Sequence, residues 1–440
     1  MRVLILAEDC NPDWPSLPVV GYKFARAIAE QADVTLVTQI RNKPNIERDG
    51  CGKAKVIYLD TENFAAPLYK FTKFLRGGDQ TGWTTSAAMN YFHALYFEWA
   101  VWQQFQHQLK NHEFDVVHRL TPMSPTQPSL IATLSPVPFV LGPLNGGLPW
   151  PKQFQAELRR EGEWLSYVRA VYRHLPFVQA TYQKSAAILA AFEHTIADLP
   201  NRDRSKVINF PEVGIDPRLF SAPNRPQRQQ MTILFVGRLV PYKLPEVVVR
   251  TFASSPLLRE HRLVVVGDGP ERSRLEDIIA EHHLEDCVQL VGRKSQVEVG
   301  QMMRDSEIFA FPSIRELGAG VVIEAMACGM APVVVDYGGP ADLVQPNCGV
   351  KVPMGNLNQL VQRFTAELEN LVTHPAQVTA YGQASHQHAV THYSWNAKAN
   401  QIMHLYDHLS GRKMSTQENA LEGFVSPSNL SKWQSPLVKS

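Results

Sequence analysis

The sequence predicts an α/β protein of two doubly wound domains, each a parallel sheet with helices on both faces. Two observations lead to this expectation. The chain has 440 residues, which exceeds one ordinary core and suits two domains of about 200 residues each. Short apolar runs alternate with helical segments, and the alternation starts again after the polar, Pro-rich stretch Asp216–Gln230.

The first half begins with an expected strand at Arg2–Glu8, a helix at Tyr22–Gln31 and a second strand at Asp33–Gln39. These strands are apolar along their whole length and do not alternate with polar residues. Such runs indicate strands that are covered on both faces, which is typical of a parallel sheet with helices on each side.

The second half repeats this arrangement with five further apolar runs. They are Met231–Leu239, His261–Gly269, Cys287–Arg293, Glu307–Ser313 and Ala331–Gly339. Helical segments fill the gaps between them, as βαβ units require.

The repeated pattern predicts four parts of the chain. They are a first α/β domain at 1–205, a second α/β domain at 206–392, a helix at 393–410 that packs back across the domains, and a disordered tail at 411–440. We expect the two domains to face each other across a cleft. The tail is polar, rich in serine and without a sustained period.

Composition narrows the class of protein. Hydrophobic residues make up 44% and charged residues 19%, and the net charge of +1 gives no general attraction to nucleic acid. Five scattered cysteines without a CxxC pair argue for a reducing compartment. The apolar run at Val3–Ala7 is too short for a signal peptide, and no run approaches the ~20 residues of a spanning helix. We therefore expect a cytoplasmic protein.

Two glutamates flank an expected helix start in the stretch RELGAGVVIEAMACG. Glu316 follows the carboxyl end of a strand, and Glu324 lies about one turn inside a helix that begins near Gly320. Ligands of open α/β sheets bind at such strand ends, and a helix N-terminus favours phosphate. The pattern predicts a diphosphate site in which the two carboxylates accept hydrogen bonds from sugar hydroxyls.

Positive charge for this site comes from FVGRLVPYK, where a strand runs into Gly237, Arg238 and Lys243. Arginine can hold phosphate in a fork, and lysine adds a point charge. Each feature also has a plainer interpretation, since an exposed Arg or Lys is usually only solvated. The segment Gly267–Arg272 is either a truncated dinucleotide motif or, as we favour, a tight strand-to-helix turn.

Together these elements resemble the family-four retaining glycosyltransferases (glycosyl transferases group 1), whose GT-B fold has two Rossmann-like domains facing a cleft. The resemblance spans roughly Arg2 to Leu409. It is strongest for four second-half segments that occur in the family's order, FVGRLVPYK, VVVGDGPERSRLE, FPSIRELGAGVVIEAMACGMAPVV and GGPADLV. Glu316 and Glu324 match the family's Glu-x7-Glu element.

The resemblance implies transfer of a sugar from a nucleotide diphosphosugar to an acceptor hydroxyl with retention of configuration. The donor would be linked to UDP or GDP, and no metal or other cofactor would be needed. The acceptor would be a sugar, a lipid-linked sugar or a small molecule, and not a nucleic acid. The resemblance makes 1–205 the acceptor-side domain and 206–392 the donor-side domain. The implied roles are catalytic for Glu316 and His118, and donor-binding for Arg238, Lys243, Glu324, Gly237, Gly320 and Val321.

The chain departs from the family in its first half. Many members carry a Gly-Gly pair in the first loop, where only Gly21 remains here, and Gly146 and Gly147 resemble a Gly-rich element of one subset. These three glycines are the expected acceptor-side residues. A nucleotide-sugar-binding protein without activity, a sugar-nucleotide epimerase and a glycosidase are the alternatives. His118 is otherwise a satisfied, half-buried histidine.

Peripheral membrane contact is a separate expectation for residues 68–78, LYKFTKFLRGG. The segment mixes basic and aromatic side chains, which together can lie at a lipid surface. The plainer alternative is a helix that packs its aromatic face on the first domain.

Overall fold

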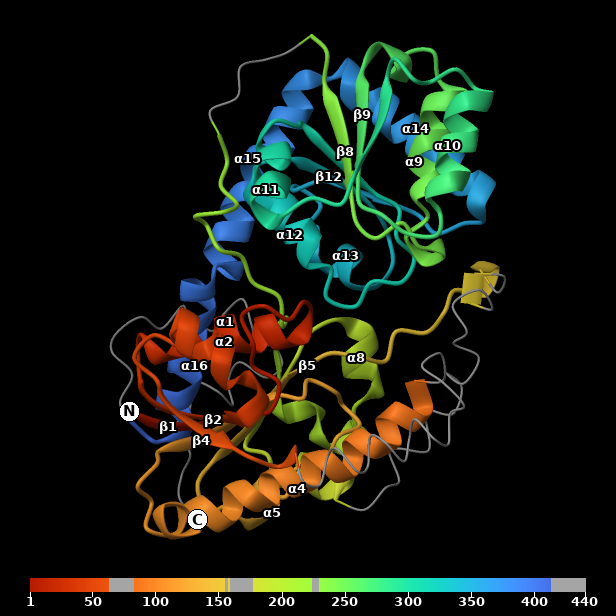
Figure 1. The fold of residues 1–440 in the computed structure, drawn as a ribbon. Helices are drawn as coiled ribbons and strands as arrows, with labels where there is room; N and C mark the ends of the chain where they lie inside the picture. The colour runs from red at the N-terminus through yellow and green to blue at the C-terminus, as the bar shows by residue number, and fades with distance from the viewer. Residues whose placement is uncertain (63–82, 155–156, 159–176, 224–228, 413–440) are drawn as a thin grey trace. The chain divides into compact units, whose positions relative to one another are not determined.

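The computed structural model describes residues 1–62, 83–154, 157–158, 177–223 and 229–412 and divides the chain into two compact units (Figure 1). Unit 1 contains residues 1–147, 163–212 and 395–440, and unit 2 contains residues 148–162 and 213–394. The chain thus enters unit 2 after Gly147 and again after Glu212, and returns to unit 1 after Ser394. The expected functional domains 1–205 and 206–392 stay predictions. The tail expected from residue 411 lies, from 413 onward, outside the described residues.

Unit 1 contains a seven-stranded sheet in the order β3-β2-β1-β4-β5-β6-β7, with parallel pairing throughout. Its strands are β1 (Arg2–Ala7), β2 (Asp33–Gln39), β3 (Lys55–Leu59), β4 (Val116–Thr121), β5 (Phe139–Leu144), β6 (Ala187–Ala190) and β7 (Val207–Asn209). Its described helices are α1 (Leu17–Ala29), α2 (Lys43–Asp49), α4 (Trp83–Lys110), α5 (Ile131–Leu134), α7 (Val178–Lys184), α8 (Glu193–Asp198) and α16 (Trp395–Leu409).

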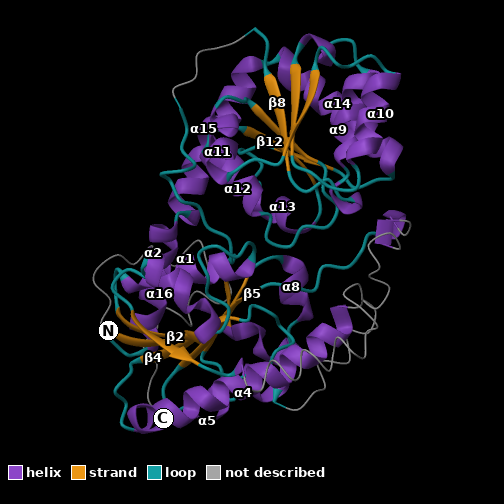
Figure 2. Ribbon diagram, in the orientation of Figure 1, coloured by secondary structure: helices purple, strands orange, loops and turns teal. Residues whose placement is uncertain are grey.

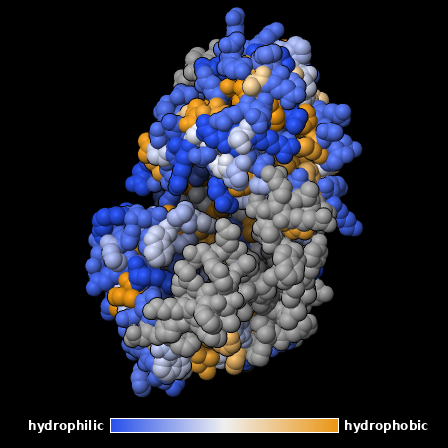
Figure 3. Space-filling model, turned by 45° about the vertical axis from the view of Figure 1, so that its right-hand side comes forward, coloured by the Kyte–Doolittle hydropathy of each residue, from blue (hydrophilic) through white to orange (hydrophobic). Residues whose placement is uncertain are grey.

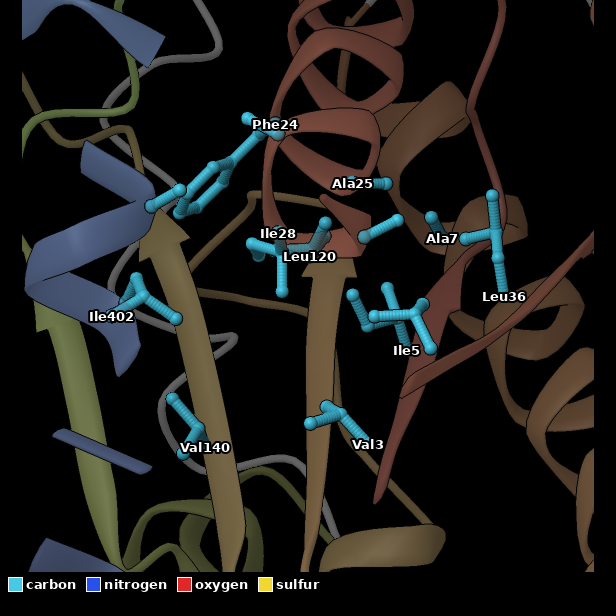
Figure 4. Close-up of a cluster of buried hydrophobic side chains, with 14 of the residues drawn as sticks. Val3, Ile5, Ala7, Phe24, Ala25, Ile28, Leu36, Leu120, Val140 and Ile402 are labelled. Atoms are coloured by element: carbon cyan, nitrogen blue, oxygen red, sulfur yellow. The ribbon is translucent and has the colours of Figure 1, made fainter. Parts of the chain in front are cut away.

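Both faces of this sheet are buried, as the uninterrupted apolar runs predict. Val3, Ile5 and Ala7 of β1 share one face, because alternate residues of a strand point the same way. They pack with α1 and α16, which contribute Phe24 and Ile402 among other side chains (Figure 4). The intervening residues of β1 pack on the other face, against side chains of α4.

Unit 2 contains a six-stranded sheet in the order β10-β9-β8-β11-β12-β13, also parallel. Its strands are β8 (Thr232–Val236), β9 (Arg262–Val266), β10 (Val288–Gly292), β11 (Ile308–Phe311), β12 (Ala331–Val335) and β13 (Val350–Val352). Its described helices are α9 (Pro245–Ser254), α10 (Arg272–Glu281), α11 (Gln296–Arg304), α12 (Gly320–Ala327), α13 (Gly338–Leu343), α14 (Leu357–Thr373) and α15 (Pro375–Tyr393). Figure 2 shows each unit as strands flanked by helices. The predicted fold class is confirmed.

Local sequence signals account for several helix ends. Capping boxes begin α11 at Ser295 and α14 at Asn356, where the side chain accepts from the backbone three residues on. The structure has a helix, α16, where the sequence predicts the final helix, and its packing across the domains stays a prediction. Helix α1 starts five residues before the predicted Tyr22, because Pro18 is well suited to the first turn of a helix.

No membrane-spanning helix is found in the described part of the chain, where none has the required length and apolarity. The described surface in Figure 3 is largely hydrophilic with smaller apolar patches between. The segment 68–78, for which membrane contact is expected, lies outside the described residues. All five cysteines are buried and free.

A cluster of buried polar side chains in unit 1 lies close to the three described points where the chain passes from one unit to the other, after Gly147, Glu212 and Ser394. Glu212, the last residue before one crossing, accepts a hydrogen bond from Asn145, and burial raises its pKa to about 7. Lys398 of α16 donates to the carbonyl of Pro211, and its ammonium lies 3.7 Å from the centre of the Phe210 ring. Burial lowers the Lys398 pKa to about 7, while the charge of Glu212 opposes this shift. Because burial disfavours the charged forms of both side chains, each of them lowers the free energy of unfolding near neutral pH.

The double variant Glu212→Gln/Lys398→Met should remove this cost. Glu212 binds a proton more readily in the folded state, so its contribution to the free energy of unfolding falls as the pH rises from about 4.5 to 7. Lys398 binds a proton less readily in the folded state, so its contribution to the free energy of unfolding rises as the pH rises from about 7 to 10.5. We expect the variant's gain in unfolding free energy over the wild type to peak near pH 7, at about 1–3 kcal/mol. Urea unfolding at pH 5, 7 and 9 measures it, and a gain independent of pH would contradict the assignment.

Candidate active site

The site is built where the strand order of unit 2 reverses. From β8 the chain proceeds outward through β9 and β10, and from β11 it proceeds in the opposite direction through β12 and β13. β8 and β11 are neighbours, pairing Ile233 with Ile308 and Leu234 with Phe309. Open α/β sheets bind ligands outside the carboxyl ends of the strands at this position. Gly237, Arg238 and Lys243 follow β8, and the segment after β11 leads into α12, which carries Gly320, Val321 and Glu324.

Two glycines let the loop after β9 support the loop after β8. A side chain at Gly267 would come within 1.8 Å of the Gly237 carbonyl oxygen, and one at Gly269 within 2.4 Å of the Leu239 oxygen. Both have positive φ, of 142° and 154°. The amide of Leu239 donates to the Asp268 carbonyl at 2.9 Å. The segment is thus a tight turn packed backbone to backbone, as the favoured interpretation of Gly267–Arg272 predicts.

Arg238 and Lys243 leave this loop in different environments. The Arg238 side chain is exposed, and its Nη2 donates to the hydroxyl of Tyr242 at 2.9 Å. Lys243 is buried, and its Nζ lies 5.1 Å from the centre of the Phe311 ring. A side chain at Gly237 would lie 3.1 Å from Lys243 Cδ, so glycine makes room for the lysine stem.

Lys243 and Glu316 form an ion pair that joins the two loops. Nζ of Lys243 donates to Oε1 of Glu316, and the side chains are only 11% and 17% exposed. The Glu316 backbone is held as well, because its carbonyl accepts from the amide of Gly339 at 2.9 Å. Glu316 is therefore fixed at both its side chain and its main chain.

Helix α12 starts four residues after Glu316. Ala319 precedes it in the left-handed conformation, with φ of 47°, and Gly320 and Val321 are its first two residues. The first amides of a helix have no intrahelical acceptor and carry partial positive charge, which favours phosphate. Glu324 follows one turn into α12 and is half-buried. The site thus combines amides, two cations and two carboxylates.

His118 lies in the core of unit 1 and not on a surface. It is fully buried on β4, and its Nδ1 and Nε2 are hydrogen-bonded to the Tyr406 hydroxyl and to the Gly142 carbonyl, the latter at 2.6 Å. Burial lowers its pKa to about 3, so the ring is neutral at neutral pH. Phe24 and Tyr406 pack edge-on against it. This environment is that of a satisfied histidine, which is the plainer interpretation that the sequence offers for it.

Comparison with known proteins identifies the part of the chain that carries the site. Residues 218–384 match the family model of Glycosyl transferases group 1 and include both loops and α12. The chain contains a domain of this family. The resemblance that the sequence predicts is thereby confirmed, and we call residues 218–384 the group 1 domain.

Relatives and solved structures agree with this. The chain is 29% identical to a D-inositol 3-phosphate glycosyltransferase of Kineococcus radiotolerans, over 53% of this chain and 57% of that protein. It is 27% identical to a GDP-mannose-dependent alpha-mannosyltransferase of Mycobacterium tuberculosis, over 46% and 51%. It thus spans about half the length of these curated relatives.

A solved structure extends the likeness beyond the group 1 domain. HepE of Anabaena, in complex with UDP and glucose, matches with a TM-score of 0.55 and 16% identity over 92% of this chain and 99% of that one. At this identity the match concerns the fold alone. It supports the GT-B fold for the chain.

The three expected acceptor-side glycines all belong to unit 1, outside the group 1 domain. Gly21 lies in α1, where a side chain would meet the Asp9 carbonyl and Thr121, each at 2.9 Å. Gly146 accepts from the Thr195 hydroxyl at 2.7 Å. A side chain at Gly147, whose φ is 87°, would collide with Asp198. Each glycine permits close packing in unit 1, and their acceptor-side role stays a prediction.

Several residues around the site were not predicted. The Tyr242 carbonyl accepts from the amide of Ile314 at 2.9 Å, so this tyrosine joins the two loops by its backbone. Gly338 and Gly339 place the start of α13 against Glu316, and the repeated glycines of GGPADLV were the available signal.

Within the described residues, no group of three or more His, Cys, Asp or Glu side chains could hold a metal ion.

Lys243→Met should lower the unfolding free energy by about 1–3 kcal/mol, because it leaves the half-buried Glu316 carboxylate without its cation. Adding Glu316→Gln should recover part of that loss, since the uncompensated charge is then gone. Urea unfolding of the wild type, both single variants and the double variant gives the coupling energy, which we expect to exceed about 0.5 kcal/mol.

Lys294→Met is the matched control for this cycle. Lys294, just before α11, pairs with Glu298 of that helix at 3.7 Å, and the two side chains are 32% and 54% exposed. Its replacement should change stability by less than about 0.5 kcal/mol. A coupling energy of zero between Lys243 and Glu316 would show that the pair does not hold the loops together.

Proposed function

We propose that the protein is a retaining glycosyltransferase that moves a sugar from a nucleotide diphosphosugar to an acceptor hydroxyl. The observation that carries the proposal is the Lys243–Glu316 pair at the switch point, next to Arg238 and the start of α12. This combination offers positive charge to a diphosphate and a carboxylate to a hydroxylated ring. The match of residues 218–384 to the group 1 family supports the same reaction.

The donor diphosphate would lie between the two loops. Lys243 has three N–H donors, so it can keep Glu316 and still donate to a phosphate oxygen. Because Glu316 offsets the charge of Lys243, the net positive charge comes from Arg238 and from the amides of Gly320 and Val321. Glu324, one turn along α12, would accept hydrogen bonds from the ribose hydroxyls.

Transfer would proceed without metal, because these groups stabilise the diphosphate as it leaves. The bond between the anomeric carbon and the phosphate oxygen breaks, and a bond to the acceptor oxygen forms on the same face. The departing phosphate oxygen takes the acceptor proton. Glu316, held at its side chain and backbone, would orient the sugar by accepting hydrogen bonds from its hydroxyls.

The donor nucleotide is proposed as UDP or GDP. The relative from Mycobacterium tuberculosis is named for GDP-mannose, and the structure from Anabaena contains UDP. The acceptor-side residues would belong to unit 1. His118 is not included as a catalytic residue, because both of its ring nitrogens are already engaged in the core.

Calorimetric titration with UDP, GDP, ADP and their sugars, without metal, tests the proposal. We expect selective binding of one nucleotide. Arg238→Ala should weaken binding by about 1.5–3 kcal/mol, the contribution of a charged hydrogen bond. Glu324→Ala should weaken it by about 1–3 kcal/mol through loss of the ribose contacts.

The matched control is Arg218→Ala, in the same unit. This arginine is 81% exposed and pairs with the nearby Asp216, so nucleotide binding should be unchanged. Product analysis then separates the alternatives. Sugar on an acceptor supports the transferase, isomerised donor an epimerase, and binding without turnover an inactive relative. Absence of any nucleotide binding would overturn the proposal, and hydrolysis of glycosides would then indicate a glycosidase.

A further inference from the structure

A segment from the first half of the chain packs on unit 2 beside the candidate site. Residues Leu148–Pro151, which we call the strap, follow the crossing at Gly147 and belong to unit 2 by their contacts. Leu148 and Trp150 of the strap are buried. Residues 152–231 separate the strap from β8, so only the fold brings them together.

The strap touches the loops that follow three neighbouring strands. The Trp150 ring packs edge-on against Tyr242, which follows β8, with ring centres 6.5 Å apart. The guanidinium of Arg315, which follows β11, lies 5.0 Å from the centre of the same ring. Tyr337, which follows β12, donates its hydroxyl to the Pro149 carbonyl at 2.8 Å.

Each residue that the strap contacts is next in sequence to a member of the Lys243–Glu316 pair or to a residue that packs against it. Tyr242 precedes Lys243, and Arg315 precedes Glu316. Tyr337 precedes Gly338, where a side chain would come within 2.7 Å of the Glu316 carbonyl oxygen and 2.9 Å of Leu148. The strap therefore contacts residues next to both members of the ion pair.

We propose that Trp150 is a positioning residue for the donor sugar, acting through Arg315 to hold the Glu316 loop in place. The inference rests on the proposed function, since it assumes that Glu316 contacts the sugar. An arginine over an aromatic face is attracted to it, and the attraction is stronger where water is excluded. Trp150 is only 9% exposed, so this contact is largely shielded.

Trp150 should affect how the protein holds the sugar of the donor but not how it holds the nucleotide. The strap contacts Tyr242, Arg315 and Tyr337, next to the Lys243–Glu316 pair, whereas Arg238, Gly320 and Glu324 would hold the nucleotide. Loss of the ring face should therefore reduce the extra affinity for nucleotide sugar over nucleotide, and reduce kcat. It should leave affinity for the nucleotide itself within about threefold, less than a single hydrogen bond contributes.

Trp150→Leu tests this, because leucine keeps apolar bulk but removes the ring. We expect kcat to fall at least about tenfold, as a shifted catalytic loop would cause. Trp150→Phe should restore most of it, since phenylalanine keeps an aromatic face for Arg315. Tyr337→Phe, which removes only the bond to Pro149, should have an intermediate effect. Trp395→Leu is the matched control, because Trp395 is equally buried but lies in the core of unit 1.

Hydrogen exchange in the protein without ligand gives a readout that does not depend on activity. The amide of Gly339, which donates to Glu316, should exchange faster in Trp150→Leu than in Trp150→Phe. Unchanged exchange would overturn the inference whatever the enzyme does. An equal loss of nucleotide and nucleotide-sugar affinity would indicate a merely structural role and also overturn it. Wild-type protein that binds no nucleotide would instead overturn the proposed function.

Discussion

The ion pair between Lys243 and Glu316 is the interaction on which the site depends. It connects the loops after β8 and β11, which leave the sheet in opposite directions at the switch point. Two largely buried charges are expensive to desolvate, and their mutual attraction offsets that cost only in a fixed geometry. The surrounding structure supplies the fixation. Gly237 makes room for the lysine stem, Phe311 lies under its ammonium, and Gly339 holds the Glu316 backbone.

This arrangement explains how acid and base can share a site for an anionic ligand. A carboxylate at a diphosphate site is unfavourable unless its charge is already balanced. Lys243 balances Glu316, so the exposed Arg238 and the start of α12 remain to attract phosphate. The same carboxylate keeps free lone pairs that can accept from hydroxyl groups. The chemistry thus follows from charge balance set before any ligand arrives.

Much of this was predictable from the sequence, because strands and their following loops are local features. The apolar runs placed β8 and β11, and Glu316, Arg238 and Lys243 follow them directly. The contacts made by Trp150 were not predictable, because no periodicity links residue 150 to residues 242, 315 and 337. For His118 the family resemblance implied a catalytic role. Its surroundings come from α1, β5 and α16, which lie far apart in the chain, so its local sequence could not predict them.

The return of the chain to unit 1 through α16 sets an order for folding during synthesis. Helix α16 contributes Ala399, Ile402 and Tyr406 to the core of unit 1, and Tyr406 hydrogen-bonds His118. Chains emerge from the ribosome from the N-terminus, and domains fold as units when their residues become available. Unit 1 is begun first, but it is completed last, since its core waits for residues that follow the whole of unit 2. Until then its sheet lacks the cover that α16 provides, and the unfinished unit 1 exposes apolar surface while unit 2 is already complete.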